Sequence, residues 1–290
     1  MPVAVNVKQL RQMRFLLTFI MLFFLVSPEY GADAAARNDD LYSGWLKMYD
    51  LRFDEAHQAV ARWEKSHASD ALGPVSQAAG YLFAELARLG ALESELFVND
   101  RRFKERHRLQ PDPRAKRLFQ QEIDAGGRLA DQALEKSPDD KDALFAKSLS
   151  LGLQADYAAL IDKQNLASLS YTKQARTYAE RLLQVDPKAY DAYLGPGVEN
   201  YLLSLKVAPI RFMLQLTGSH IDKVKGIEEL KMTAAHGHYL EPFAKLLLAV
   251  AALRDKDAPQ AQRLLQELHD RFPSNPLYAR ELSRLTAGTE

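Results

Sequence analysis

Apolar residues recur three and four positions apart along most of the chain after residue 38, which is the spacing of amphipathic helices. The stretch from Pro242 to Pro273 shows this pattern most clearly, because a polar turn at 254–257 separates two such segments. No run alternates with a period of two over a useful length, so the pattern predicts an all-α fold without a sheet. The apolar positions of this hairpin are Phe243, Leu246, Leu247, Val250 and Leu253 in its first helix and Ala261, Leu264, Leu265 and Leu268 in its second.

The same spacing predicts helices earlier in the chain. A first helix follows the polar residues at 38–40, a second starts at Phe53, and a third runs from about Leu72 to Leu89. From Arg114 onward the helices become longer. The later units end at turns around Pro138, Pro187 and Gly237. The apolar positions expected to be buried in the first two helices are Leu41, Trp45, Met48, Tyr49, Ala56, Val60 and Trp63.

Small residues stand where the two helices of the last hairpin should cross. Leu248-Ala249 and Ala261 occupy the crossing, and Pro273 closes the unit. In these features the hairpin resembles a tetratricopeptide repeat (TPR), which has about 34 residues in two antiparallel helices. It departs from that family at Lys245, where a large aromatic residue is usual. The matching small positions in earlier, degenerate or longer units are Gly44, Leu151-Gly152 and Ala175.

The TPR resemblance implies an α-solenoid of antiparallel helix pairs with elongated repeats. It divides the chain into degenerate N-terminal helices at 35–110 and a superhelical domain at 111–290. TPR arrays bind other proteins or hold them together, and the resemblance names no partner.

The N-terminus has the composition of a bacterial secretory signal peptide. Basic residues precede an apolar run at 15–26, and Ala32-Asp33-Ala34 has the small-x-small form of a cleavage site. As a helix the run would span about 18 Å, short of the roughly 30 Å hydrocarbon core of a bilayer. We therefore expect cleavage after Ala34, which removes residues 1–34 and leaves a periplasmic or secreted protein of Gram-negative type. An uncleaved anchor and a true start at Met13 are the alternatives.

One stretch, 195–218, departs from the regular pattern. Gly195-Pro196-Gly197 should break or kink a helix as it begins, Pro209 should interrupt it again, and Gly218 should end it. Only two charged residues lie between Tyr201 and Leu216, so a helix there would be apolar on nearly all sides. Such a helix packs in a core, lines a pocket or partner groove, or contacts a second copy or a membrane surface. The sequence leaves these alternatives open, with membrane contact the least favoured.

The same stretch carries a second, weaker resemblance. Leu194-Gly195, the run 201–205, Pro209, Gly218 and the run 226–230 are similar to the central part of a eukaryotic TPR family. That family is linked to the mitochondrial outer membrane and to the clearance of protein inclusions. The resemblance implies a shared helical scaffold with a buried apolar hairpin, and it implies no enzymatic activity.

These features favour a non-enzymatic scaffold or adaptor that binds a protein or peptide partner in a concave groove. Tyrosines suit such a surface because each offers apolar area and a hydroxyl group. The alternative is a carrier whose small ligand or lipid occupies a cavity walled by the apolar helix at 198–216. Core packing is the further alternative for each side chain. The residues expected to line the groove or pocket are Tyr157, Tyr190, Tyr193, Asn200, Tyr201, Phe212 and Met213.

Composition narrows the functional classes further. With 38 basic and 38 acidic residues the formal net charge is zero, so nothing global attracts nucleic acid. The one basic cluster, 100–108, holds a single aromatic residue and has the character of a solvated helix end. The chain has no cysteine, which excludes disulfides, thiolate metal sites and cysteine nucleophiles.

Catalytic and cofactor motifs are also missing from the sequence. It contains no P-loop, no dinucleotide-binding glycine pattern, no Gly-x-Ser-x-Gly and no His-Glu-x-x-His, so we expect neither an enzyme nor a cofactor. His236 and His238 share one turn and are weak metal candidates. Histidines near helix ends also cap carbonyl groups or lie on the surface, and that is the role we expect for these two.

Overall fold

The computed structural model describes residues 39–90, 110–204 and 222–287, and all packing discussed below belongs to the unit from Asp40 to Glu290. Within the described ranges every regular element is helical and no strand occurs, which confirms the predicted all-α class. None of the described helices is long and apolar enough to cross a membrane. The signal segment 1–34, the basic cluster 100–108, Phe212 and Met213 lie outside the described residues.

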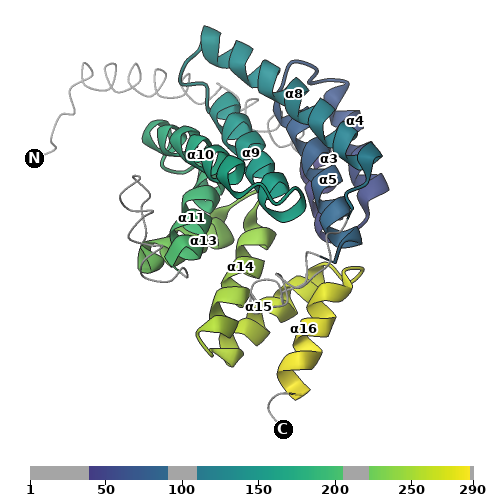
Figure 1. Cartoon of the computed structure of the whole chain (residues 1–290), viewed down its shortest axis with the longest axis vertical. Coiled ribbons are helices and arrows are strands. Elements are labelled where there is room, and N and C mark those ends of the chain that lie inside the picture. The colour runs from purple at the N-terminus through teal and green to yellow at the C-terminus, as the bar shows by residue number, and fades with distance from the viewer. Residues whose placement is uncertain (1–38, 91–109, 205–221, 288–290) are drawn as a thin grey trace, which may run out of the picture. The chain divides into compact units, whose positions relative to one another are not determined.

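The helices pack mainly against their neighbours in chain order (Figure 1). Their bounds agree with the predicted third helix, with the long helix from Arg114 to Lys136, and with the last hairpin. The α-helices are α3 (Asp39–Tyr49), α4 (Phe53–Glu64), α5 (Leu72–Arg88), α8 (Pro113–Lys136), α9 (Lys141–Asp156), α10 (Asn165–Val185), α11 (Leu194–Ser204), α13 (Lys223–His236), α14 (Glu241–Arg254), α15 (Ala258–Arg271) and α16 (Pro276–Ala287). A π-helical segment, η1 (Tyr157–Ile161), extends α9, and a 3-10 turn, η2 (Tyr190–Tyr193), precedes α11.

Side-chain caps fix where several of these helices begin. Asp112, Asp140, Asp222 and Asp257 each precede a helix, and each carboxylate accepts a hydrogen bond from a backbone N–H group of the first turn. Prolines stand in the first turn of α8, α14 and α15, where the missing N–H group costs no intrahelical bond.

Glycines mark the closest approaches between paired helices. A Cβ atom at Gly44 of α3 would lie 3.4 Å from the carbonyl oxygen of Ala56 in α4. At Gly126 of α8 it would lie 3.3 Å from the carbonyl oxygen of Ala71, which precedes α5. The crossing of α11 and α13 is tighter, because a Cβ at Gly226 would lie 2.9 Å from the carbonyl oxygen of Gly197.

This last crossing corrects the prediction for Gly195-Pro196-Gly197. We expected the three residues to break or kink the helix, but α11 begins at Leu194 and continues through them to Ser204. The proline lies in the first turn, where its missing N–H group is tolerated. Gly197 serves the crossing, since it lets the backbone of α13 approach.

Buried aromatic residues join α3 to the turns that precede α14 and follow α15. The ring centroids of Trp45 and Tyr239 are 5.9 Å apart, and those of Tyr49 and Phe272 are 5.7 Å apart. A single hydrophobic cluster accordingly includes buried residues from Leu41 to Tyr278. The seven apolar positions predicted for α3 and α4 are all buried, as are most of those predicted for the last hairpin.

Candidate functional site

The structure places the predicted site residues on two parts of the chain. Tyr157 opens η1 and is buried, with its ring stacked on Phe119 of α8 at a centroid distance of 4.6 Å. Tyr190 and Tyr193 lie on η2 and are partly buried, while Asn200 and Tyr201 are buried on α11. Tyr190 and Tyr193 are therefore partly accessible to solvent. Tyr157, Asn200 and Tyr201 are core positions.

Charged side chains are buried where α11 packs between α10 and α13. The Arg176 guanidinium Nη1 lies 3.1 Å from Glu199 Oε2, and its Nε lies 2.7 Å from Glu180 Oε1. Asn200 Nδ2 donates a hydrogen bond of 2.8 Å to Glu229 Oε2. Only 10% of the Arg176 side chain and 3% of the Glu199 side chain are exposed, so each ion depends on the other for compensation.

Opposing influences act on the pKa of Glu229 in this cluster. Burial raises the pKa of its carboxyl group, while the hydrogen bond from Asn200 and the nearby positive charge of Lys225 act in the opposite direction. The Oδ1 atom of Asn200 has no hydrogen-bond partner within the described residues. The cluster joins three helices through the Arg176–Glu199 ion pair and the hydrogen bond from Asn200 to Glu229.

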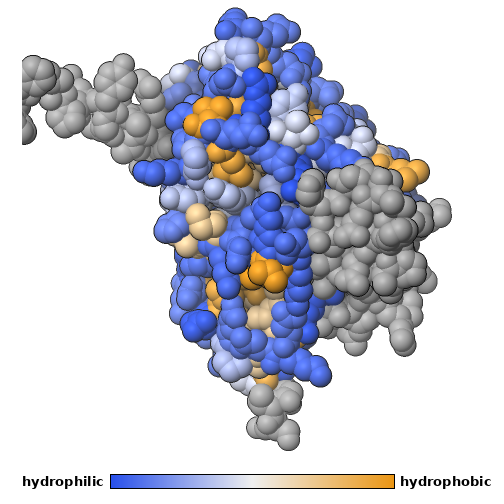
Figure 2. All heavy atoms as spheres, turned by 90° about the vertical axis from the view of Figure 1, so that its left-hand side faces the viewer, coloured by the Kyte–Doolittle hydropathy of each residue, from blue (hydrophilic) through white to orange (hydrophobic). Residues whose placement is uncertain are grey.

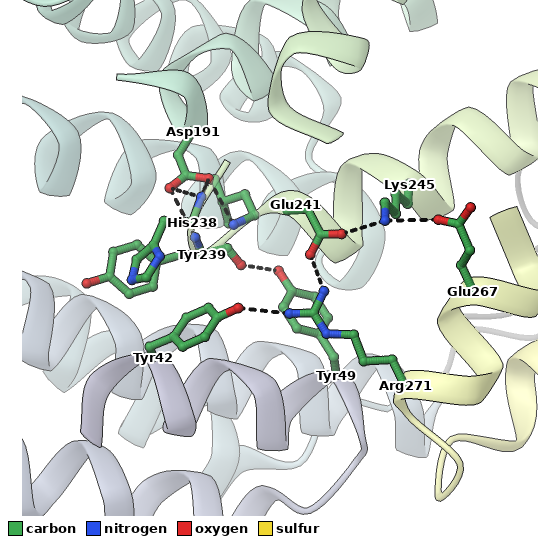
Figure 3. Close-up of polar contacts among 10 residues, drawn as sticks. Tyr42, Tyr49, Asp191, His238, Tyr239, Glu241, Lys245, Glu267 and Arg271 are labelled. Atoms are coloured by element: carbon green, nitrogen blue, oxygen red, sulfur yellow. Dashed lines mark hydrogen bonds and ion pairs between the residues drawn. The ribbon is translucent and has the colours of Figure 1, made fainter. Parts of the chain in front are cut away.

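A second polar group organises the turn between α13 and α14 (Figure 3). The Asp191 carboxylate on η2 accepts hydrogen bonds of 3.0 Å from the backbone N–H groups of His238, Tyr239 and Leu240. Burial raises the pKa of Asp191, and the three N–H donors oppose that shift. Gly237 is required beside it, because a Cβ there would lie 2.7 Å from Asp191 Oδ1.

Arg271 of α15 continues this polar region to α3 (Figure 3). Its Nη2 donates a hydrogen bond of 2.8 Å to the Tyr42 hydroxyl, and its Nη1 pairs with Glu241. Glu241 also pairs with Lys245 at 2.8 Å, and Lys245 reaches Glu267 at 3.0 Å. Lys245 therefore joins α14 to α15 through Glu267, while its pair with Glu241 lies within α14.

The two histidines of this turn have aromatic neighbours. The His238 ring stacks on Tyr42 with centroids 4.4 Å apart and 15° between the planes, and the His236 ring lies 4.7 Å from Tyr190. Burial lowers the pKa of His238, and the charge of Asp191 opposes that shift. Within the described ranges, no group of three or more His, Asp or Glu side chains is arranged to hold a metal ion. The turn thus offers the two imidazoles no third ligand among those residues.

A groove of about 340 Å³ lies between α8 and α9. It is open to solvent and lined mostly by polar and charged side chains, with two apolar ones. Its walls are Ile123, Asp124, Gly127, Arg128 and Asp131 on α8 and Lys147, Ser150, Leu151 and Gln154 on α9.

The charges of this groove are of both signs. Lys147 pairs with Asp131 across it. Asp124 accepts a hydrogen bond of 2.9 Å from Gln120, and the described residues supply no ion pair to Asp124 or Arg128. A Cβ atom at Gly127 would meet nothing within 4 Å, so this glycine leaves space in the groove and relieves no close contact.

The face shown in Figure 2 is mostly hydrophilic, and its hydrophobic patches are separate from one another. Single exposed apolar residues of this kind are normal on a soluble protein. Among the residues that the structure describes, the most exposed large apolar side chains are Leu166 at 86%, Val224 at 68%, Val185 at 42% and Met232 at 37%.

No family model matches the chain. No curated protein and no solved structure is significantly similar to it either.

The sequence-based reasoning missed both the groove and the polar region at the turn after α13. One local signal did point to the groove. Gly126 and Gly127 are adjacent in the middle of a helix, where each glycine costs roughly 1 kcal/mol relative to alanine. No local sequence signal pointed to the hydrogen bonds that Asp191 accepts from residues 238–240, since nearly 50 positions separate the partners.

Proposed function

We propose that this protein is a secreted, periplasmic, non-enzymatic scaffold of TPR-like helix pairs that binds a segment of a protein partner. One observation carries the proposal. Helix pairs along the chain meet through small residues, at Gly44 with Ala56, at Ala71 with Gly126 and at Gly197 with Gly226. Small residues at several helix contacts, in a chain whose helices pack mainly against their sequence neighbours, support an array of repeated helix pairs.

The C-terminal end of the described unit supports the same proposal. The amphipathic helix α16 packs on α15 after the last hairpin, as a terminal capping helix does in repeat arrays. The charged groups at the α10–α11–α13 interface and around Arg271 pair with one another, and their contacts join helices. Their positions suit a structural role, which leaves the open surfaces between helices for binding.

Recovery of a defined partner tests the proposed function. The full chain would be affinity-purified from the periplasm of its own host after brief crosslinking, and an enriched protein would be produced separately and mixed with it. A discrete complex with fixed stoichiometry by native mass spectrometry is the expected result. If the chain instead retains a small molecule through purification and forms no complex with any protein, it is a carrier and the scaffold proposal fails.

A further inference from the structure

The groove between α8 and α9 contains two opposite charges that the described residues leave without ion pairs. Asp124 and Arg128 are both exposed on α8, whereas the neighbouring charges Asp131 and Lys147 neutralise each other. Asp124 and Arg128 are four positions apart, which is a rise of about 6 Å along the helix axis. The groove therefore presents a negative and a positive side chain from backbone positions about 6 Å apart along α8.

That separation matches the repeat of an extended peptide. Side chains two residues apart in an extended chain lie on one side, roughly 6.6 Å from each other. Between the two charges Gly127 leaves the space that any side chain would occupy. From the opposite wall, Gln154 supplies an amide group with both donor and acceptor capacity, which suits the backbone of such a peptide.

We propose that this groove is the partner-binding site and that it takes an extended peptide segment with a basic and an acidic side chain two residues apart. The basic side chain pairs with Asp124 and the acidic one with Arg128. This inference rests on the proposed scaffold function. It adds the place of binding and the charge pattern of the bound segment.

Charge-swapped peptides provide the test. Three fluorescein-labelled heptapeptides would be compared by anisotropy against the full chain, with central sequences Lys-Thr-Glu, Lys-Thr-Lys and Glu-Thr-Glu. The wild type should prefer Lys-Thr-Glu by about twofold to fivefold over each of the others, the range of one exposed ion pair. Asp124→Lys should reverse that order in favour of Glu-Thr-Glu. Asp54→Lys changes an exposed acid on α4, outside the groove, and should keep the wild-type order.

Gly127→Ala adds a test that leaves every charge in place. A methyl group in the groove should weaken Lys-Thr-Glu binding by about twofold or more, while thermal unfolding shows that the fold is intact. Equal affinity for the three peptides, no binding of any of them, or the same order after Asp124→Lys would overturn the groove assignment. If a recovered partner binds Asp124→Lys and Gly127→Ala as tightly as it binds wild type, the scaffold function is supported but the groove is not its binding site. If wild type recovers no partner, the proposed function itself fails.

Discussion

The last hairpin and the layer of α10, α11 and α13 share an antiparallel arrangement but differ in what fills their interfaces. In the hairpin, apolar and small side chains occupy the crossing, and Ala249, Ala261 and Leu265 are fully buried. In the layer, α11 and α13 meet through the backbones of Gly197 and Gly226, with the Arg176–Glu199 ion pair buried beside them.

The two interfaces derive their stability from different sources. Apolar burial is non-directional and roughly proportional to area, so many sequences with the right periodicity satisfy the hairpin. A buried ion pair is directional, and each partner offsets the desolvation cost of the other. We therefore expect the hairpin to respond to changes of polarity, and the layer to respond most when one partner of a pair is removed.

The largest effect is expected for Leu248→Asp in the last hairpin. Leu248 is 5% exposed and packs in a cluster with Tyr201 and Leu230. Loss of the leucine costs about 2–5 kcal/mol. A carboxylate without a partner adds further cost, so unfolding at ambient temperature is the expected result. Chemical denaturation followed by circular dichroism measures this. Leu166→Asp, at a leucine that is 86% exposed, is the matched control and should change stability little.

The next effect is expected for the buried ion pair of the layer. Arg176→Met leaves Glu199 charged and without its buried partner, which should cost about 3–5 kcal/mol in the free energy of unfolding. The double variant Arg176→Met with Glu199→Met removes both charges and should recover most of that loss. Urea denaturation of the two single variants and the double variant gives the coupling energy. Additive losses would show that the two side chains do not stabilise each other.

The sequence was informative for the first kind of interface and much less so for the second. Helical spacing predicted the burial of Trp45, Val60 and Leu265, because an apolar side chain needs only a face to be buried. It also predicted the turn at Gly237. The partners of Arg176 and Asp191 were not predictable, because polar pairing depends on which helices become neighbours and in which register. Gly-Pro-Gly was misjudged for the same reason, since local propensity conveys nothing about the close approach of α13.

A carboxylate to which the described residues supply no ion pair sharpens the contrast with Glu199. Asp156 ends α9, and burial raises its pKa to about 7. Unfolded, it titrates near pH 4, so the folded state binds the extra proton between about pH 4 and 7. The contribution of Asp156 to the free energy of unfolding is therefore fully present below about pH 4, and it is lost as the pH rises to about 7. The full pKa shift of Asp156 corresponds to about 4 kcal/mol in the free energy of unfolding. The side chain has partial access to solvent, which reduces this contribution.

Asp156→Asn removes this pH-dependent penalty. The variant should be more stable than wild type at pH 8, by about 2–3 kcal/mol, and close to wild type at pH 4. Urea midpoints at both pH values measure the difference. A constant difference across the range would mean that Asp156 titrates alike in the folded and unfolded states.

The smallest effects are expected at two neighbouring glycines of α8, which repeat the comparison within one helical turn. A Cβ at Gly126 would lie 2.5 Å from Val75 Cγ2 and 3.3 Å from the carbonyl oxygen of Ala71. Gly126→Ala should therefore destabilise by about 1–3 kcal/mol through overpacking, despite alanine's better helix propensity. At Gly127 nothing lies within 4 Å, so alanine contributes only its propensity and should stabilise by about 0.5–1 kcal/mol.

Thermal unfolding of the two alanine variants separates packing from propensity, because the substitution and the helix are the same. Opposite signs are expected, with Gly126→Ala below wild type and Gly127→Ala above it. If both variants were stabilised, the approach of α5 to α8 would be looser than these distances require, and Val75 would move aside at little cost. If both were destabilised, Gly127 would be needed for the fold itself. If Gly127→Ala is more stable than wild type, the glycine at this position lowers the stability of α8 and at the same time keeps the groove open.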